Sequence, residues 1–259
     1  YADSVALFGG KPVFVPLTDH FHLDLDAVEN RISRRTKMVF LASPSNPTAA
    51  VLREGEIRRL ANLALKHNLL LVIDEVYQRL LYGDVRHFSI CQVDEVKERA
   101  ILLNSFSKTY AMTGWRVGYL VADTKVIRDL VELHKALVIC VNAPAQKAGV
   151  AALTGPQDCV ESMKAEYQRR MGFVEKTLEG IGRVSTPPCE GAFYFFPRFQ
   201  HKLTSREMTA YLAERGIMVR SGTEFGQRGQ HHIRLSFATS MEHLQEGMER
   251  LKGALDELD

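Results

Sequence analysis

Short apolar runs alternate with longer amphipathic segments along the first half of the chain, and this alternation limits the folds it can adopt. The apolar runs cover residues 13–15, 37–42, 69–73, 100–103 and 117–121. Runs of this length without polar interruption are typical of strands buried on both faces of a sheet. Between two of them, residues 53–67 predict an amphipathic helix. Its apolar face comprises Ile57, Leu60, Ala61 and Ala64.

The pattern changes in the second half of the chain. Residues 157–180 predict a long charged helix. Shorter predicted strands follow at 192–196, 217–220 and 232–237, and further predicted helices at 205–215 and 241–258. We therefore expect an α/β protein: a three-layer sandwich with a mainly parallel sheet in a large domain (residues 1–160), followed by a connecting helix and a smaller α+β domain (residues 161–259).

Composition excludes several classes of partner. The chain has 259 residues with 33 basic and 31 acidic side chains, a net charge of +2, so bulk charge gives no argument for nucleic acid or a membrane. No apolar run approaches the roughly 20 residues needed to span a bilayer. The cysteines form no CxxC pair, which predicts reduced core thiols in a cytoplasmic protein. These cysteines are Cys91, Cys140, Cys159 and Cys189.

Histidines occur as two close pairs, at residues 20 and 22 and at residues 231 and 232. No cluster of further ligands completes either pair, so we predict solvated histidines and no metal site.

One lysine stands in an unusual place. Lys108 closes the segment Ser-Phe-Ser-Lys that follows the apolar run 100–103, and Arg116 comes eight residues later. Desolvation disfavours a charged ammonium, so a lysine there can serve as an amine nucleophile well below the ordinary pKa of about 10.4. Arg116 can bind a phosphate bidentately, and Ser105 can donate to the same anion. The segment suggests a lysine that forms a Schiff base with pyridoxal phosphate.

Two further residues follow a predicted strand. Asp74 ends the run 69–73, where ligands of open α/β sheets bind, and its carboxylate would favour a protonated pyridine nitrogen. Tyr77 could point the same way if a helical turn follows the strand. The alternative for Asp74 is a helix cap, which we would favour if Lys108 were absent.

Two polar side chains suit the recognition of a ligand. Asn46 lies between two prolines in a forced turn after the run 37–42, where its amide could be a fixed donor to a cofactor hydroxyl, although such segments are more often simple turns. Arg234 lies within an apolar predicted strand and needs an anionic partner. A substrate carboxylate or an internal acid would satisfy it equally well.

Five motifs in this order closely resemble the class I/II aminotransferases, which are fold-type I enzymes dependent on pyridoxal phosphate. They are Ser-Asn-Pro-Thr (45–48), Asp-Glu-Val-Tyr (74–77), Ser-Phe-Ser-Lys-Thr-Tyr (105–110), Met-Thr-Gly-Trp-Arg-Val-Gly-Tyr (112–119) and Ile-Arg-Leu-Ser-Phe-Ala (233–238). The resemblance runs from about residue 9 to the C-terminus. It implies a homodimer that moves an amino group between an L-amino acid and a 2-oxo acid.

The resemblance also implies a role for each residue. Lys108 would form the Schiff base and move the substrate proton, and Asp74 would pair with the pyridine nitrogen. Asn46 and Tyr77 would bind the phenolic oxygen of the cofactor. The phosphate would lie against Ser105 and Arg116. Arg234 would bind the substrate carboxylate.

The sequence departs from the family pattern in two ways. Ala49 replaces the usual glycine after Asn-Pro-Thr, which is tolerable unless that position needs a positive φ. The family's N-terminal segment, with its phosphate loop and its aromatic residue that stacks on the cofactor, is missing from the match. The alternatives are therefore a carbon–sulfur lyase or an aminocyclopropanecarboxylate-synthase-like enzyme that uses the same lysine, or a catalytically silent fragment.

Overall fold

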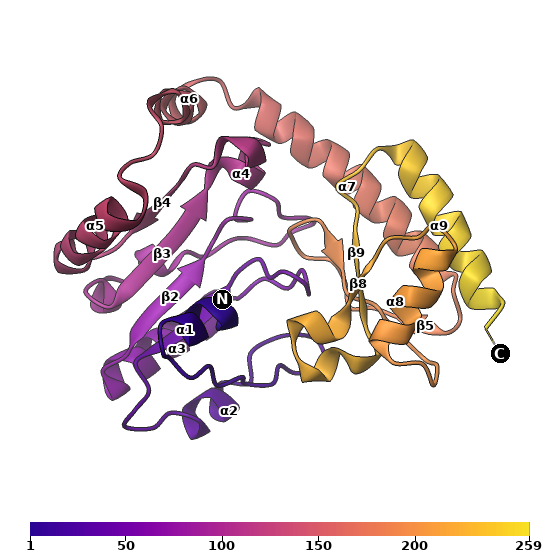
Figure 1. The fold of residues 1–259 in the computed structure, drawn as a ribbon, viewed down its shortest axis with the longest axis horizontal. Helices are drawn as coiled ribbons and strands as arrows, with labels where there is room; N and C mark the ends of the chain where they lie inside the picture. Colours follow the sequence, from indigo (N-terminus) through magenta and orange to yellow (C-terminus); the bar gives the residue numbers. More distant parts are fainter. Residues whose placement is uncertain (259) are drawn as a thin grey trace.

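The architecture is built around a four-stranded sheet in the computed structural model, which describes residues 1–258 (Figure 1). The strands lie side by side in chain order: β1 (Met38–Ala42), β2 (Leu70–Asp74), β3 (Ala100–Ser105) and β4 (Gly118–Val121). The first three are parallel, and β4 runs antiparallel to β3. The predicted α/β class with a mainly parallel sheet is confirmed.

One face of this sheet packs against the predicted helix α3 (Glu54–His67). Its first turn is capped because the Glu56 carboxylate accepts from the Arg53 backbone N–H at 2.8 Å. It ends at Asn68, whose φ of 55° is left-handed. All four residues of its predicted apolar face are buried, and they pack with Leu71 and Ile73 of β2. This packing fixes the position of β2, whose carboxyl end carries Asp74.

Further short elements complete this half of the chain. They are α1 (Ala2–Leu7), α2 (Leu25–Asn30), η1 (Ile90–Gln92), η2 (Asp94–Val96), α4 (Phe106–Thr109) and η3 (Thr113–Trp115).

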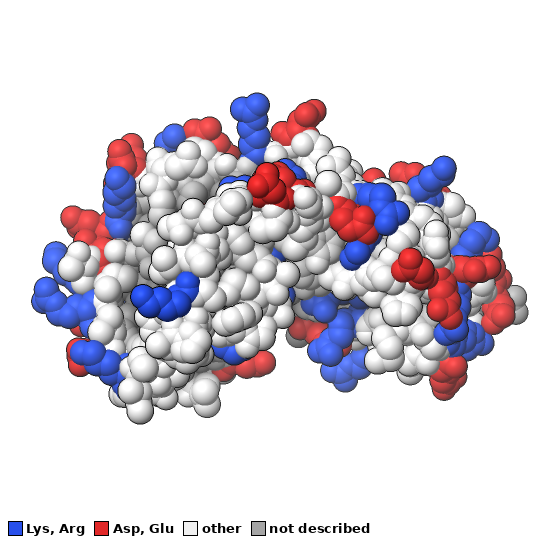
Figure 2. All heavy atoms as spheres, turned by 90° about the horizontal axis from the view of Figure 1, so that it is seen from above, with Lys and Arg blue, Asp and Glu red and all other residues white. Residues whose placement is uncertain are grey.

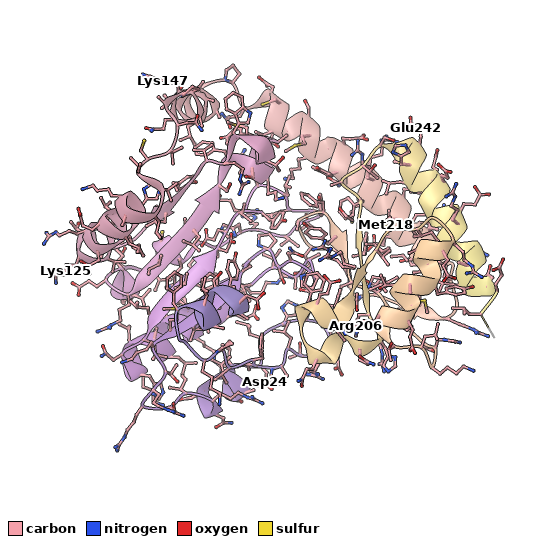
Figure 3. The ribbon with its side chains drawn as sticks, in the orientation of Figure 1. Asp24, Lys125, Lys147, Arg206, Met218 and Glu242 are labelled. Atoms are coloured by element: carbon pink, nitrogen blue, oxygen red, sulfur yellow. The ribbon has the colours of Figure 1, made fainter. Side chains whose placement is uncertain are left out.

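Two helices that the sequence analysis did not predict lie beyond β4. They are α5 (Thr124–Val138), capped by Asp123, and α6 (Ala143–Thr154), capped by Asn142. No residue of α5 is buried. Charged side chains gather at the two ends of the molecule when it is seen from above, and a largely uncharged surface lies between them (Figure 2). The labelled Lys125 and Lys147 lie on the outer sides of α5 and α6 (Figure 3). Several large apolar side chains on the two helices are exposed, namely Val131, Leu133, Leu137, Val138, Val150 and Leu153.

The second half of the chain forms an antiparallel α+β arrangement. The long helix α7 (Asp158–Glu179) leads into it (Figure 1). A three-stranded sheet has the order β6 (Tyr194–Phe195), β9 (Ile233–Ser236), β8 (Arg220–Ser221), and β5 (Val184–Ser185) pairs with β7 (Arg198–Phe199). The remaining elements are α8 (Ser205–Glu214), η4 (Gly222–Phe225), η5 (Gln227–His231) and α9 (Met241–Asp256).

An aromatic cluster joins the two halves. Tyr77 and Leu80, which follow β2, are buried in the same apolar cluster as Phe193 and Phe237. The rings of Tyr77 and Phe193 meet edge to face with centroids 5.3 Å apart. The carboxyl end of β2 is therefore held against the second half of the chain.

Two predictions about the strands were wrong. Residues 13–15 form no strand: Pro12 and Pro16 flank them and lack backbone N–H groups, and Val13 and Phe14 are 59% and 65% exposed. Strand β4 is a sheet edge rather than a strand buried on both faces, and Tyr119 and Val121 are exposed.

Most of the cysteines are not core thiols. All four are free, but Cys91, Cys140 and Cys159 are exposed, and Cys189 is buried. Within the described residues, no helix is long and apolar enough to cross a membrane.

Ala49, which stands where the related motif has glycine, adopts a φ of 62°. Its N–H donates to the Ser45 carbonyl at 3.0 Å, and its carbonyl accepts from the Gly191 N–H at 3.0 Å. A side chain in the left-handed region costs about 1–2 kcal/mol for an L-residue. The turn therefore keeps a glycine conformation while carrying a methyl group.

We expect Ala49→Gly to lower the free energy of unfolding less than Ala64→Gly does, and we expect the two losses to differ by about 1–2 kcal/mol. Only the first substitution relieves a left-handed alanine. The two alanines are matched in burial, each 1% exposed, and Ala64 lies within helix α3. Each substitution removes one buried methyl group, worth roughly 0.8 kcal/mol. Free energies of unfolding from urea titration measure the difference, and equal losses in the two variants would contradict this account.

Candidate active site

Lys108 lies in the short helix α4, directly after β3, and reaches toward the aromatic cluster that joins the two halves. Its Nζ is 5.2 Å from the ring centroid of Phe193 and 5.9 Å from that of Tyr77. Desolvation by partial burial lowers the pKa of Lys108, and the positive charges of Arg116 and Arg234 lower it further. These surroundings favour the neutral amine, which is the nucleophilic form.

Asp74 ends β2, as predicted, and its carboxylate is held at one oxygen. The Val76 N–H donates to Oδ1 at 3.0 Å, and the Asp74 carbonyl accepts from the Ser43 N–H at 2.9 Å. Burial raises the pKa of Asp74, and the neighbouring charge of Glu75 raises it further. The other oxygen, Oδ2, accepts a hydrogen bond from the Tyr1 hydroxyl. Asp74 thus has one fixed oxygen and one that serves an external donor.

Arg234 lies on β9 with its guanidinium between two aromatic rings. Its Cζ is 4.5 Å from the ring centroid of Tyr194 and 5.0 Å from that of Phe225. An Nη1 hydrogen bond of 2.9 Å reaches Oδ1 of Asn46, on the turn after β1. Its Nε is buried and has no hydrogen-bond acceptor among the described residues. Arg234 is therefore oriented but has an unused donor, as an anion-binding group requires.

Tyr77 and Asn46 also face this region. The Tyr77 hydroxyl is 3.0 Å from the Tyr194 hydroxyl, and burial raises the pKa of Tyr77, which keeps it a neutral donor. Since Oδ1 of Asn46 accepts from Arg234, the amide nitrogen of Asn46 is left as a donor.

The two predicted phosphate ligands lie on either side of the loop between β3 and β4. The Ser105 hydroxyl interacts with the Ser107 hydroxyl at 2.9 Å and the Val117 carbonyl at 3.1 Å. The exposed Arg116 donates from Nη1 to the Thr113 carbonyl at 2.8 Å, which leaves its other donors available. Its φ of 53° is left-handed.

The predicted residues gather where the three parallel strands end, because Asn46, Asp74 and Ser105 follow or close β1, β2 and β3. Lys108 and Arg116 follow Ser105 along the chain, and Arg234 reaches the group from the second half of the molecule through its bond to Asn46. This edge is where ligands of open α/β sheets bind.

Other features that could hold a ligand lie apart from this group. A cavity of about 310 Å³ is lined by His20, Phe21, His22, Thr48, Ala50, Pro187, Pro188 and Glu190, none of which the sequence analysis selected for the site. Among the described residues, no group of three or more His, Cys, Asp or Glu side chains could hold a metal ion. Burial lowers the pKa of His232 to about 4, so it is neutral and is packed against the Phe196 ring.

The charges of the site fit pyridoxal phosphate. The charges of two guanidiniums lower the pKa of Lys108 beyond the effect of burial, and one buried guanidinium nitrogen lacks an acceptor among the described residues. A phosphate and a substrate carboxylate would compensate this excess of positive charge. Oδ2 of Asp74 accepts from a side-chain donor, the Tyr1 hydroxyl, and a ring N–H could donate to it in place of Tyr1.

The family model "Aminotransferase class I and II" matches residues 1–251. The chain belongs to this family. Its members are pyridoxal-phosphate enzymes, so the resemblance seen in the sequence is confirmed.

Curated relatives and solved structures agree with this assignment. An aspartate aminotransferase of Pyrococcus abyssi is 39% identical over 99% of this chain and 67% of its own length. An aromatic-amino-acid aminotransferase of Thermococcus litoralis is 38% identical over the same shares. The crystal structure of an aromatic aminotransferase from Pyrococcus horikoshii has a TM-score of 0.95 and 39% identity, and the match covers 99% of this chain and 70% of that one. The chain thus spans about two thirds of the length of these aminotransferases.

Sequence reasoning missed the aromatic residues that line the site. Phe193 and Tyr194 were assigned only to a strand, and Phe225 was assigned to no element, yet they contact Lys108 and Arg234. The two adjacent acidic residues, Asp74 and Glu75, were a further signal of a functional site, but the sequence analysis assigned a role only to Asp74.

We expect Arg116→Gln to slow the modification of Lys108 by an amine-reactive ester between pH 7 and 9. Removing a nearby positive charge raises the lysine pKa toward its ordinary value, so less neutral amine is present. Peptide mass spectrometry gives the labelling rate at each pH. The control is Arg58→Gln, which removes an exposed arginine paired with Glu54 on α3. Equal Lys108 labelling profiles in the two variants would contradict this electrostatic assignment.

Proposed function

We propose that this chain moves an amino group between an L-amino acid and a 2-oxo acid, with Lys108 as the catalytic residue. The observation that carries the proposal is the half-buried lysine between two guanidiniums at the carboxyl end of a parallel sheet. The named functions of its relatives support the same reaction.

Bound pyridoxal phosphate supplies an electron sink that stabilises negative charge at the substrate Cα. Lys108 Nζ attaches the cofactor, and as a neutral amine it takes the proton from the substrate Cα. The neighbouring charges of Arg116 and Arg234 favour that neutral form. We assign these roles to Lys108 because its surroundings suit a base that works near neutral pH.

The other residues bind and orient. We propose that Arg234 binds the substrate α-carboxylate, because it is fixed by Asn46 and has an unused buried donor. Ser105 and Arg116 hold the phosphate.

Asn46 and Tyr77 donate to the phenolic oxygen, and Asp74 accepts from the pyridine nitrogen through Oδ2. That oxygen accepts a hydrogen bond from the Tyr1 hydroxyl, so a donor can reach it.

We further propose the assembly and location of the protein. The exposed apolar side chains of α5 and α6 support a homodimer, because association would bury them. Four free cysteines support a cytoplasmic location. We also propose that residues 1–160 form the large domain, which holds the cofactor. Residues 161–259 then form the connecting helix and the small domain.

Product analysis tests the proposed reaction. With pyridoxal phosphate, amino-acid donors and 2-oxo acids, we expect a new amino acid in equal amount to the 2-oxo acid formed from the donor. We expect Lys108→Ala to lose at least about 10³-fold in rate, because both the proton carrier and the point of attachment are removed.

Two outcomes would overturn the proposal. Release of ammonia and a thiol from a thioether amino acid, without a new amino acid, would identify a lyase. Equal rates with the chain and with Lys108→Ala, both at the level of free cofactor, would identify a silent fragment.

A further inference from the structure

A buried cluster of polar groups surrounds the side chain of Glu75, the residue that follows Asp74. The Glu75 carboxylate is 0% exposed and is bound at both oxygens. Its Oε2 is 2.7 Å from Nε2 of His87, and its Oε1 accepts from the Ser89 hydroxyl at 3.0 Å and the Ile90 N–H at 3.1 Å. We call the side chains of Glu75, His87 and Ser89 the Glu75 cluster.

The Glu75 cluster is more than a packing element. An apolar side chain of similar size would fill the same space without any need to desolvate a carboxylate. Nδ1 of His87 is buried without a hydrogen-bond partner among the described residues, so the arrangement carries a second desolvation penalty. A carboxylate at this place is consistent with a role that an apolar side chain could not perform.

The cluster is connected to Asp74 through the backbone. Glu75 lies between Asp74 and Val76, and the Val76 N–H holds Oδ1 of Asp74 at 3.0 Å. The Glu75 N–H donates to the Leu103 carbonyl of β3 at 2.9 Å, and its side chain is bound to the segment 87–90. Glu75, whose peptide bond to Val76 orients the Val76 N–H, is therefore fixed by the sheet at its backbone and by segment 87–90 at its side chain.

We propose that Glu75 is a positioning residue, held by His87 and Ser89, that fixes the Val76 N–H and thereby aims Oδ2 of Asp74 at the cofactor. The proposal rests on the role proposed above for Asp74. Glu75 acts without touching the cofactor, because it reaches Asp74 through Val76. No relative's name and none of the motif assignments gives this function to Glu75 or His87.

The first measurement needs no cofactor. Amide hydrogen exchange in Glu75→Ala should speed up at Val76 by at least roughly tenfold relative to Leu71 and Ile73 of β2, because the Val76 hydrogen bond is lost while the strand remains. His87→Phe should have the same local effect. His87→Gln, whose amide can still donate to Glu75, should restore most of the protection.

A matched control is Ser205→Ala. Ser205 is also 0% exposed, and its hydroxyl lies 2.7 Å from that of Ser221 in the second half of the chain. A general loss of stability would accelerate Val76, Leu71 and Ile73 alike in every variant. That pattern would overturn the proposal.

The second measurement is a double-mutant cycle on the dissociation constant of pyridoxal phosphate. Glu75→Ala should weaken binding roughly tenfold in the otherwise unchanged protein, and by less than about twofold when Asp74→Ala is already present. Equal fold-changes in the two backgrounds would show that Glu75 does not act through Asp74. If the unsubstituted chain binds no cofactor, the proposed function fails, and hydrogen exchange still decides whether the cluster fixes Val76.

Discussion

The candidate site depends on a concentration of positive charge where parallel strands end. Lys108, Arg116 and Arg234 come from two halves of the chain. Burial lowers the pKa of Lys108, and the charges of the two guanidiniums lower it further. Such a group is stable only with anionic partners or with one member neutral. The lysine is the member that can give up its proton, and this makes it a nucleophile. The phosphate and carboxylate of the proposed ligands would neutralise the two guanidiniums.

The order of the parallel strands brings these charges together. Helix α3 buries one face of the parallel strands, so Asn46, Asp74 and Ser105 lie at neighbouring strand ends. The aromatic cluster of Tyr77 and Phe193 then holds the second half of the chain against that edge. Backbone hydrogen bonds join the halves as well, from the Gly191 N–H to the Ala49 carbonyl at 3.0 Å and from the Ala192 N–H to the Leu80 carbonyl at 2.9 Å. Arg234, the one site residue from the second half, is positioned by these contacts together.

Much of this arrangement could be predicted from local sequence. Strands β1 to β3 and helix α3 were evident because uninterrupted apolar runs and a one-sided apolar face have distinct periods. Residues 13–15 looked like a strand, but an apolar run cannot show whether another strand is available to pair with it. Helix α5 does carry an apolar stripe at helical spacing, Val126, Leu130, Leu133 and Leu137, and the sequence analysis left it unused.

The residues of the site could be predicted only where they belong to a recognisable sequence motif. Lys108, Asp74 and Arg234 each follow or lie in a predicted strand, so their chemistry suggested their place. Glu75 and His87 are twelve residues apart with no regular element between them, and only the folded chain shows that they meet. For Ala49 the sequence raised a positive φ only as a condition, because the related motif has glycine there, and the folded backbone meets that condition. Long-range contacts and backbone conformation are the parts that sequence alone could not supply.

Reductive trapping is the most direct test of the central claim. The chain is incubated with pyridoxal phosphate, reduced with borohydride and digested, and every modified lysine is located by mass spectrometry. We predict that the pyridoxyl group is found on Lys108 at near-stoichiometric occupancy. Modification spread over surface lysines, with Lys108 unmodified, would contradict the assignment of this lysine and the site built around it.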